Sequence, residues 1–166
     1  MKVMLISEKT LKSDSLINDN VDPLYIVPAI EIAQEQGLQP ILGTLLYTYI
    51  LQLVSNRNIP ADYKKLLDDY ITPYLEYKVM SDIQIPLSYK FRNLGMNQNN
   101  SEHTYSPSLR DVQYLVEFYD NKAKFYAQRM YEFLRANSSK YPQFCQYQSC
   151  ADMRPNKLSY KTNIVL

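Results

Sequence analysis

The segment of residues 106–137 constrains the fold most strongly, because it carries one helical pattern over its whole length. It reads "SPSLRDVQYLVEFYDNKAKFYAQRMYEFLRAN". Ser108 and Asp111 have the spacing of a capping box, which marks a helix start. The apolar stripe that follows consists of Val112, Leu115, Tyr119, Ala123, Tyr126, Met130 and Leu134. A helix of about 45 Å, at 1.5 Å per residue, must bury this stripe against other helices, so the chain is predicted to be mainly α-helical.

Two shorter helical patterns precede this segment. Residues 40–54 predict a core helix, because apolar side chains recur at helical spacing along one wide face. This face comprises Ile41, Leu42, Leu45, Leu46, Tyr49, Ile50 and Leu53. Residues 60–83 predict a second helix, in which Tyr63, Leu67, Tyr70 and Tyr74 repeat. Pro73 is expected to kink it, because proline has no amide donor for the helical ladder.

The bounds of a helix within residues 22–37 depend on its prolines and its glycine. Asp22 suits the N-cap, Pro23 the first helical position and Gly37 the C-terminal end. Pro28 lies one turn inside and would clash with the carbonyl four residues back. Either the first turn is separate, or the regular helix begins at Pro28 and ends at Gly37. Before this segment, residues 1–20 predict only a short strand or arm followed by a helical turn.

A polar stretch separates the two halves of the helical pattern. The residues before it, "LSYKF", alternate like a strand, with Leu87, Tyr89 and Phe91 on one side. The stretch itself, residues 92–108, reads "RNLGMNQNNSEHTYSPS". Both flanks belong to one helical core, so we interpret the stretch as the turn and return arm of a projecting hairpin. Gly95 suits the tight backbone, and the amides offer hydrogen bonds without charge.

Composition limits the classes of function. The chain has 166 residues, of which 46% are hydrophobic and 21% charged, and its formal net charge is +1. These values predict one soluble globular domain without a general electrostatic attraction to nucleic acid. No apolar run has the length of a signal-peptide core or of a membrane span of roughly 20 residues. We therefore expect a cytosolic protein in which Cys145 and Cys150 stay reduced, although one bridge between them is conceivable.

The sequence contains no catalytic or metal-binding signature. His103, the single histidine, stands beside Ser101 and Glu102 in the polar stretch, where a solvated loop is a better interpretation than a nucleophile site. Glu31 and Glu35 are one helical turn apart, and a solvated helix face is preferred over a cation site. The same holds for the adjacent Asp68 and Asp69. We expect no enzyme activity, no cofactor and no metal.

Tyrosine is the most unusual feature of the composition, with 16 tyrosines against three glycines. Tyrosines on the apolar stripes are expected in the core, whereas those off the stripes are candidates for subunit contacts. The candidates are Tyr47, Tyr77, Tyr114 and Tyr131. The C-terminal "NIVL" either adds as a strand to a neighbouring sheet edge or is a frayed tail.

The order of these segments resembles that of a family of phage proteins. The segments are "PAIEIAQEQGLQPILGTLL", "DYKKLLDDYITPYLEYKVM", the amide-rich interruption and the long helix followed by "YPQF". Together, over about residues 5–144, they resemble the head-tail connector proteins of tailed phages and are most similar to the ring proteins of crAss-like phages.

This resemblance implies a structural virion protein of the neck, assembled in the cytoplasm of the host bacterium. Such adaptors are helical bundles with an inserted β-hairpin or loop, and they form homo-oligomeric rings, typically of twelve copies, under the portal. The implied partners are the portal protein, a second ring, stopper or tail protein, and genomic DNA that passes non-specifically through the lumen. No membrane partner is implied. A near-neutral subunit suits sliding DNA, because neutralised phosphates would add affinity.

The resemblance also divides the chain into a helical connector domain, residues 1–144, and an extended C-terminal tail, residues 145–166. The hairpin insertion falls on about residues 86–107 and is expected to face the channel or an adjacent subunit. Its candidate contact residues are Lys90, Arg92, Asn97, Gln98, Asn99, Asn100, His103 and Tyr105. The tail is longer than the family pattern, and its candidate docking residues are Tyr160, Lys161, Thr162, Asn163, Ile164, Val165 and Leu166.

An alternative function is a small helical DNA-binding or regulatory module. Lys90, Arg92 and the basic tail motivate this alternative, which predicts duplex binding with a steep salt dependence.

Overall fold

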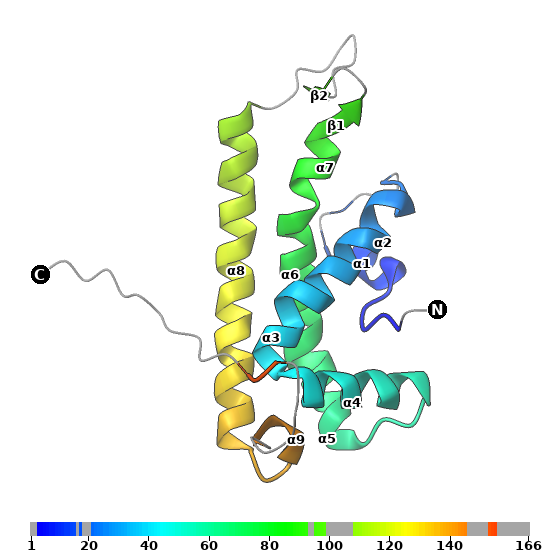
Figure 1. Cartoon of the computed structure of the whole chain (residues 1–166), viewed down its shortest axis with the longest axis vertical. Helices are drawn as coiled ribbons and strands as arrows, with labels where there is room; N and C mark the ends of the chain where they lie inside the picture. The colour runs from blue at the N-terminus through cyan, green and yellow to red at the C-terminus, as the bar shows by residue number, and fades with distance from the viewer. Residues whose placement is uncertain are drawn as a thin grey trace, which may run out of the picture.

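The computed structural model describes residues 3–15, 17, 21–92, 95–98, 108–145 and 153–155. Its fold is mainly helical and bundle-like, which confirms the predicted fold class (Figure 1). The helices and strands in chain order are α1 (Glu8–Asp14), α2 (Pro23–Ile32), the π-helix η1 (Ala33–Leu38), α3 (Gln39–Leu42), α4 (Thr44–Ser55), α5 (Ala61–Leu66), the π-helix η2 (Leu67–Ile71), α6 (Thr72–Asp82), α7 (Gln84–Ser88), β1 (Tyr89–Arg92), β2 (Gly95–Gln98), α8 (Leu109–Ala136) and α9 (Pro142–Cys145).

Helices α6 and α8 lie side by side as the central pair of the bundle (Figure 1). The predicted capping box is confirmed: the Asp111 amide donates to Ser108 Oγ at 3.3 Å, and the Ser108 amide donates to Asp111 Oδ2 at 3.1 Å. On α8 the buried residues are Val112, Tyr119, Ala123, Ala127, Met130 and Leu134. Ser81 of α6, itself buried, donates to the carbonyl of Val116 at 3.1 Å and so links the two helices through a polar contact inside the core.

Both predicted alternatives for the segment around Pro28 are wrong, because α2 runs without a break from Pro23 through this proline. Pro28 and Leu24 are both exposed, so water can bond the Leu24 carbonyl that lacks its helical donor. Gly37 does not end the helix either and lies inside η1. A Cβ atom at Gly37 would sit 2.5 Å from the Tyr74 hydroxyl, so this glycine permits the close crossing of η1 and α6.

Two prolines follow π-helical turns, and these turns explain how the chain stays helical around them. The amide of Gln39 bonds the carbonyl of Gln34, five residues back, and Pro40 comes next. The amide of Thr72 bonds the carbonyl of Leu67 in the same way, and Pro73 follows. The extra residue in each turn changes the hydrogen-bond register just before a residue that has no N–H to donate. At Pro73, where a kink was predicted, the chain stays helical, and the π-helical turn η2 comes just before it.

The N-terminal segment is tied to the bundle by one buried glutamine. The Leu5 amide donates to Gln34 Oε1 at 2.6 Å, and Gln34 Nε2 donates to the carbonyl of Val3 at 3.2 Å. Gln34 is buried, so these two bonds satisfy polar atoms that would be costly to leave unpaired. The arm before α1 is held in this way against η1.

The continuous core helix predicted over residues 40–54 is wrong at Gly43, where α3 ends and α4 begins. Gly43 has φ +76° and ψ 153°, a conformation that is essentially restricted to glycine. Residues 153–155, from the C-terminal part of the chain, dock at this break. The Thr44 amide donates to the Met153 carbonyl at 2.9 Å, and the Met153 amide donates to Thr44 Oγ1 at 2.9 Å. A Cβ atom at Gly43 would lie 2.6 Å from Pro155 Cδ.

Replacing Gly43 with Ala is expected to lower the free energy of unfolding by at least about 2 kcal/mol, because it adds backbone strain and a clash with Pro155. Urea unfolding followed by circular dichroism measures this loss. The matched background is Pro155→Ala, which removes the Cδ and Cγ atoms that the new methyl group would meet. If Gly43→Ala costs the same in both backgrounds, the docked segment is not what requires glycine here.

The region before the polar stretch is helical for longer than predicted. Leu87 and Ser88 belong to α7, so the predicted strand is wrong for these two residues; the Leu87 amide donates to the carbonyl of Ile83 at 3.1 Å and continues the helical ladder. Strand β1 then pairs antiparallel with β2, with Tyr89 opposite Gln98 and Arg92 opposite Gly95. Gly95 thus lies in a strand, whereas the prediction placed it in the turn. The strands lie at the end of the bundle away from α9 (Figure 1).

Candidate docking surface on helix α8

Helix α8 exposes aromatic side chains on the side that does not face the core. Tyr114 is 68% exposed, Phe118 43% and Phe125 60%. Their spacing of four and seven residues places them on one helix face. A helix that only covers a core would carry polar residues there. This set, which we call the aromatic face of α8, is therefore a candidate docking surface.

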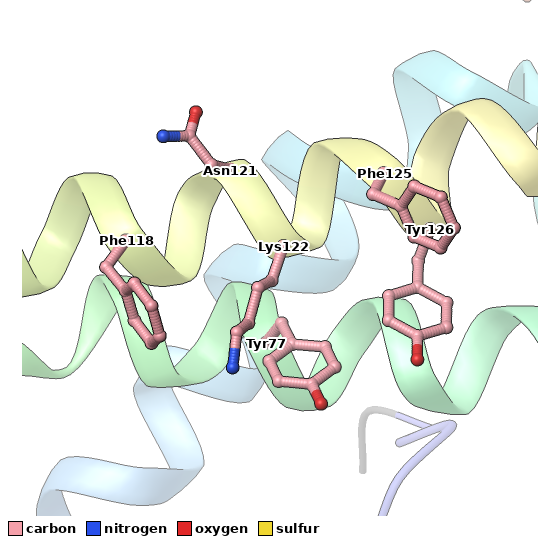
Figure 2. A pocket seen from close by; sticks show the side chains of 6 residues that line it. All are labelled: Tyr77, Phe118, Asn121, Lys122, Phe125 and Tyr126. Carbon is pink, nitrogen blue, oxygen red and sulfur yellow. The ribbon is translucent and has the colours of Figure 1, made fainter.

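A hollow of about 450 Å³ lies along this face, between α6 and α8 (Figure 2). Its lining residues are Tyr77 from α6 and Phe118, Asn121, Lys122, Phe125 and Tyr126 from α8. Tyr77 stacks on Tyr126 with ring centroids 5.3 Å apart and an interplanar angle of 16°. Phe125 meets Tyr126 edge-on at 5.4 Å and 84°. Because these rings already contact one another, a partner that covers them loses little side-chain entropy on binding.

Lys122 places a positive charge inside the hollow. Its Nζ atom lies 4.4 Å from the ring centroid of Phe118 and 5.3 Å from that of Tyr77. Figure 2 shows the ammonium group between these two rings, while Asn121 points away from them. Cation–π contacts of this kind hold the lysine over the aromatic surface. The centre of the surface therefore combines exposed rings with one fixed cation.

Carboxylates lie on the other side of Lys122. A second hollow, of about 350 Å³, shares Tyr77, Phe118 and Lys122 with the first and is also lined by Asp14 and Glu76. Burial raises the pKa of Glu76, and the negative charge of Asp14 raises it further. The surface thus has an aromatic centre beside polar groups of both signs, which is a composition typical of protein–protein interfaces.

The other charges near α6 connect the two central helices. Lys78 Nζ lies 2.7 Å from Asp82 Oδ1 and 3.9 Å from Asp120 Oδ1, and Lys124 lies 2.7 Å from Asp120 Oδ2. Burial raises the pKa of Asp82, against the opposing effect of Lys78. This network spans from α6 to α8 and has a structural role in their pairing.

The described part of the chain holds neither a metal-binding cluster nor a helix that could span a membrane. Among residues 3–15, 17, 21–92, 95–98, 108–145 and 153–155, no three His, Cys, Asp or Glu side chains lie close enough to hold a metal ion. Over the same residues, none of the helices combines the length and the apolar character that crossing a membrane requires.

A family model matches residues 38–154, from the last residue of η1 to the segment docked at Gly43. The chain belongs to DUF6712, a family of unknown function. All six residues that line the hollow of Figure 2 fall inside the part of the chain that defines DUF6712, whereas α1 and α2 precede it. No curated protein and no solved structure matched the chain.

The predicted contact residues of the insertion are only partly placed by the structure of this DUF6712 member. Lys90 and Arg92 lie in β1, and Asn97 and Gln98 in β2, where the structure describes the backbone. Several other residues singled out in the polar stretch and in the C-terminal tail fall outside the described residues. They are Asn99, Asn100, Ser101, Glu102, His103, Tyr105, Cys150 and the tail from Tyr160 to Leu166.

The tyrosines proposed for subunit contacts divide into three groups. Tyr47 is buried in the core, so its prediction as a surface contact is wrong: the break at Gly43 turns α4 away from the helical register assumed over residues 40–54. Tyr131 is half-buried, with its ring 5.8 Å from that of Phe144. Tyr114 belongs to the aromatic face of α8, and Tyr77 of α6 lines the hollow beside it. Asp68 and Asp69 are exposed, as expected.

Sequence reasoning missed Phe118, Lys122 and Phe125, because the search for one apolar stripe assigned the rest of α8 to solvent. A signal was present. Tyr114, Phe118 and Phe125 repeat at helical spacing on a second face, and a second aromatic face on one helix indicates a second contact.

Proposed function

We propose that this chain is a structural virion protein, a head-tail connector subunit that assembles into a homo-oligomeric ring. The ring bridges the portal to a second ring, stopper or tail protein, and genomic DNA passes through its lumen. The observation that carries the proposal is the exposed aromatic face of α8, in which Phe125 already packs against Tyr126, because such a surface suits permanent contact with another protein.

The placement of the strands supports the same function. The β1–β2 pair lies at the end of the α6–α8 arm, away from the junction of α4, α5 and α9 (Figure 1). An element at the tip of a helical arm can reach a lumen or a neighbouring subunit without disturbing the core. The residues of this pair and of the following stretch are rich in amides, which suit a surface along which DNA slides.

Mixing the full-length chain with the portal protein of the same phage tests the proposal. We expect a ring seated on the portal in negative-stain images and a complex heavier than the portal in light scattering. A chain that stays monomeric and does not bind the portal contradicts the proposal. Duplex DNA is the second probe: tight binding that weakens steeply with salt would favour a DNA-binding or regulatory module instead.

A further inference from the structure

Helix α2 has apolar residues on both of its sides. One side, with Ile26, Ala29 and Ile30, is buried in the core. On the other side Leu24 is 72% exposed and Ile32 45% exposed, with the exposed Pro28 between them. These three residues are spaced by four and share one helix face. We call them the aliphatic face of α2.

The two exposed apolar faces belong to helices on different sides of α6. Helix α6 packs against both α2 and α8. Figure 1 shows the N-terminal half of α2 across α6 from α8. The two faces therefore cannot cover each other within one copy of the chain. They can do so between copies, if the α8 side of one meets the α2 side of the next.

Charge distinguishes the two sides as well. Residues 21–38, which include α2, contain three acidic residues and no lysine or arginine, the acids being Asp22, Glu31 and Glu35. From Lys122 to its end at Ala136, α8 has the opposite balance, with four basic residues against Glu132. The basic residues are Lys122, Lys124, Arg129 and Arg135. A contact between this basic stretch and the α2 side joins opposite charges, whereas a contact with the same stretch of another copy would join like charges.

We infer that the aromatic face of α8 in one copy docks on the aliphatic face of α2 in a second copy. Leu24 and Ile32 are of a size to enter the hollow between Tyr77, Phe118 and Phe125, and Lys122 then lies toward the acidic segment of the neighbour. Such a contact is heterologous: each copy keeps one face of each kind for the next, and the series forms the proposed ring when the rotation from copy to copy closes the circle. This inference rests on the proposed ring and names the surfaces that form it.

Two variants with one disabled face each provide the test. In the α8 variant, Tyr114→Asp and Phe125→Asp, acidic groups would meet the acidic α2 side. In the α2 variant, Leu24→Asp and Ile32→Asp remove the aliphatic side chains. Each variant alone is expected to self-associate about 100-fold more weakly than the wild type or worse, and to run as a monomer in size-exclusion chromatography with light scattering.

An equimolar mixture of the two variants is the decisive sample. Each retains one intact face, so the mixture is expected to form a heterodimer and nothing larger. The matched control is Ile85→Asp, because Ile85 is 50% exposed on α7 and lies outside both faces. It should assemble like the wild type. Because all five residues are exposed, circular dichroism should report unchanged helical content in each variant.

The outcomes separate this inference from the proposed function. A wild-type chain that neither self-associates nor joins the portal overturns both. A wild-type ring that persists in either variant overturns the interface and leaves the ring standing. Loss of assembly in both folded variants without a heterodimer in the mixture overturns the head-to-tail pairing.

Discussion

Replacing Tyr141 with Ala is expected to lower the free energy of unfolding by about 3–5 kcal/mol, which is typical of removing a buried aromatic ring. Tyr141 is 1% exposed. Its ring lies 5.2 Å from that of Tyr63, edge-on at 83°, and 5.8 Å from that of Phe133. Its hydroxyl donates to the carbonyl of Asp62 at 2.9 Å. The side chain thus joins α5, α8 and α9, and its loss leaves a cavity at their junction.

Two further variants distinguish the contribution of the Tyr141 ring from that of its hydroxyl, and from the effect of losing any tyrosine. Tyr141→Phe keeps the ring and is expected to cost about 1 kcal/mol, the usual contribution of one hydrogen bond. Tyr114→Ala removes an exposed tyrosine and should change stability by no more than about 0.5 kcal/mol. Urea unfolding followed by circular dichroism measures all three. The assignment of Tyr141 to the core is wrong if Tyr141→Ala and Tyr114→Ala have equal effects.

The sequence was sufficient to predict those elements whose structure depends on residues close together along the chain. The capping box of Ser108 and Asp111 and the stripe from Val112 to Leu134 are local patterns, and α8 follows both except at Leu115, which is 38% exposed. The strand predicted from alternation alone was displaced, because five residues of "LSYKF" can satisfy a period of two while Leu87 still bonds back to Ile83. Short patterns discriminate poorly between a last helical turn and a first strand residue.

The features that sequence reasoning could not place depend on residues far away along the chain. Gly43 breaks a pattern that looks continuous, and the reason is Met153 and Pro155, more than 100 residues later. Gly37 was assigned to a helix end, yet its role depends on Tyr74 of α6. Each glycine marks a close approach, and its partner is visible only when the chain is folded.

Phe118 and Phe125 of the aromatic face of α8 were missed for a different reason. The residues of this face lie on one helix and their spacing is readable, but only exposure separates an aromatic residue that packs inside from one that faces out. Tyr119 is buried and the adjacent Phe118 is 43% exposed, although either fits an apolar stripe. Tertiary packing decides between them, through the position of α6.

Alkaline pH is expected to destabilise the fold through two buried tyrosines. Burial raises the pKa of Tyr141 to about 12, and Asp62 adds to this effect. Burial also raises the pKa of Tyr74, with Asp82 as the second cause. The unfolded chain releases these protons near pH 10, whereas the folded chain retains them. Their contribution to stability is thus complete below pH 10 and is lost as the pH rises toward the folded-state pKa, at about 1.4 kcal/mol per pH unit for each tyrosine.

Urea unfolding at several pH values between about 9 and 12 measures this slope, because linkage relates it to the protons that unfolding releases. Tyr141→Phe should make the slope shallower by the contribution of one proton, since phenylalanine has none to release. Tyr74→Phe should act in the same direction, and the double variant should remove both contributions, because the two sites lie in separate contacts. A Tyr141→Phe variant with the slope of the wild type would mean that this hydroxyl ionises equally readily in the folded and unfolded chain, which is incompatible with its burial between α5 and α9.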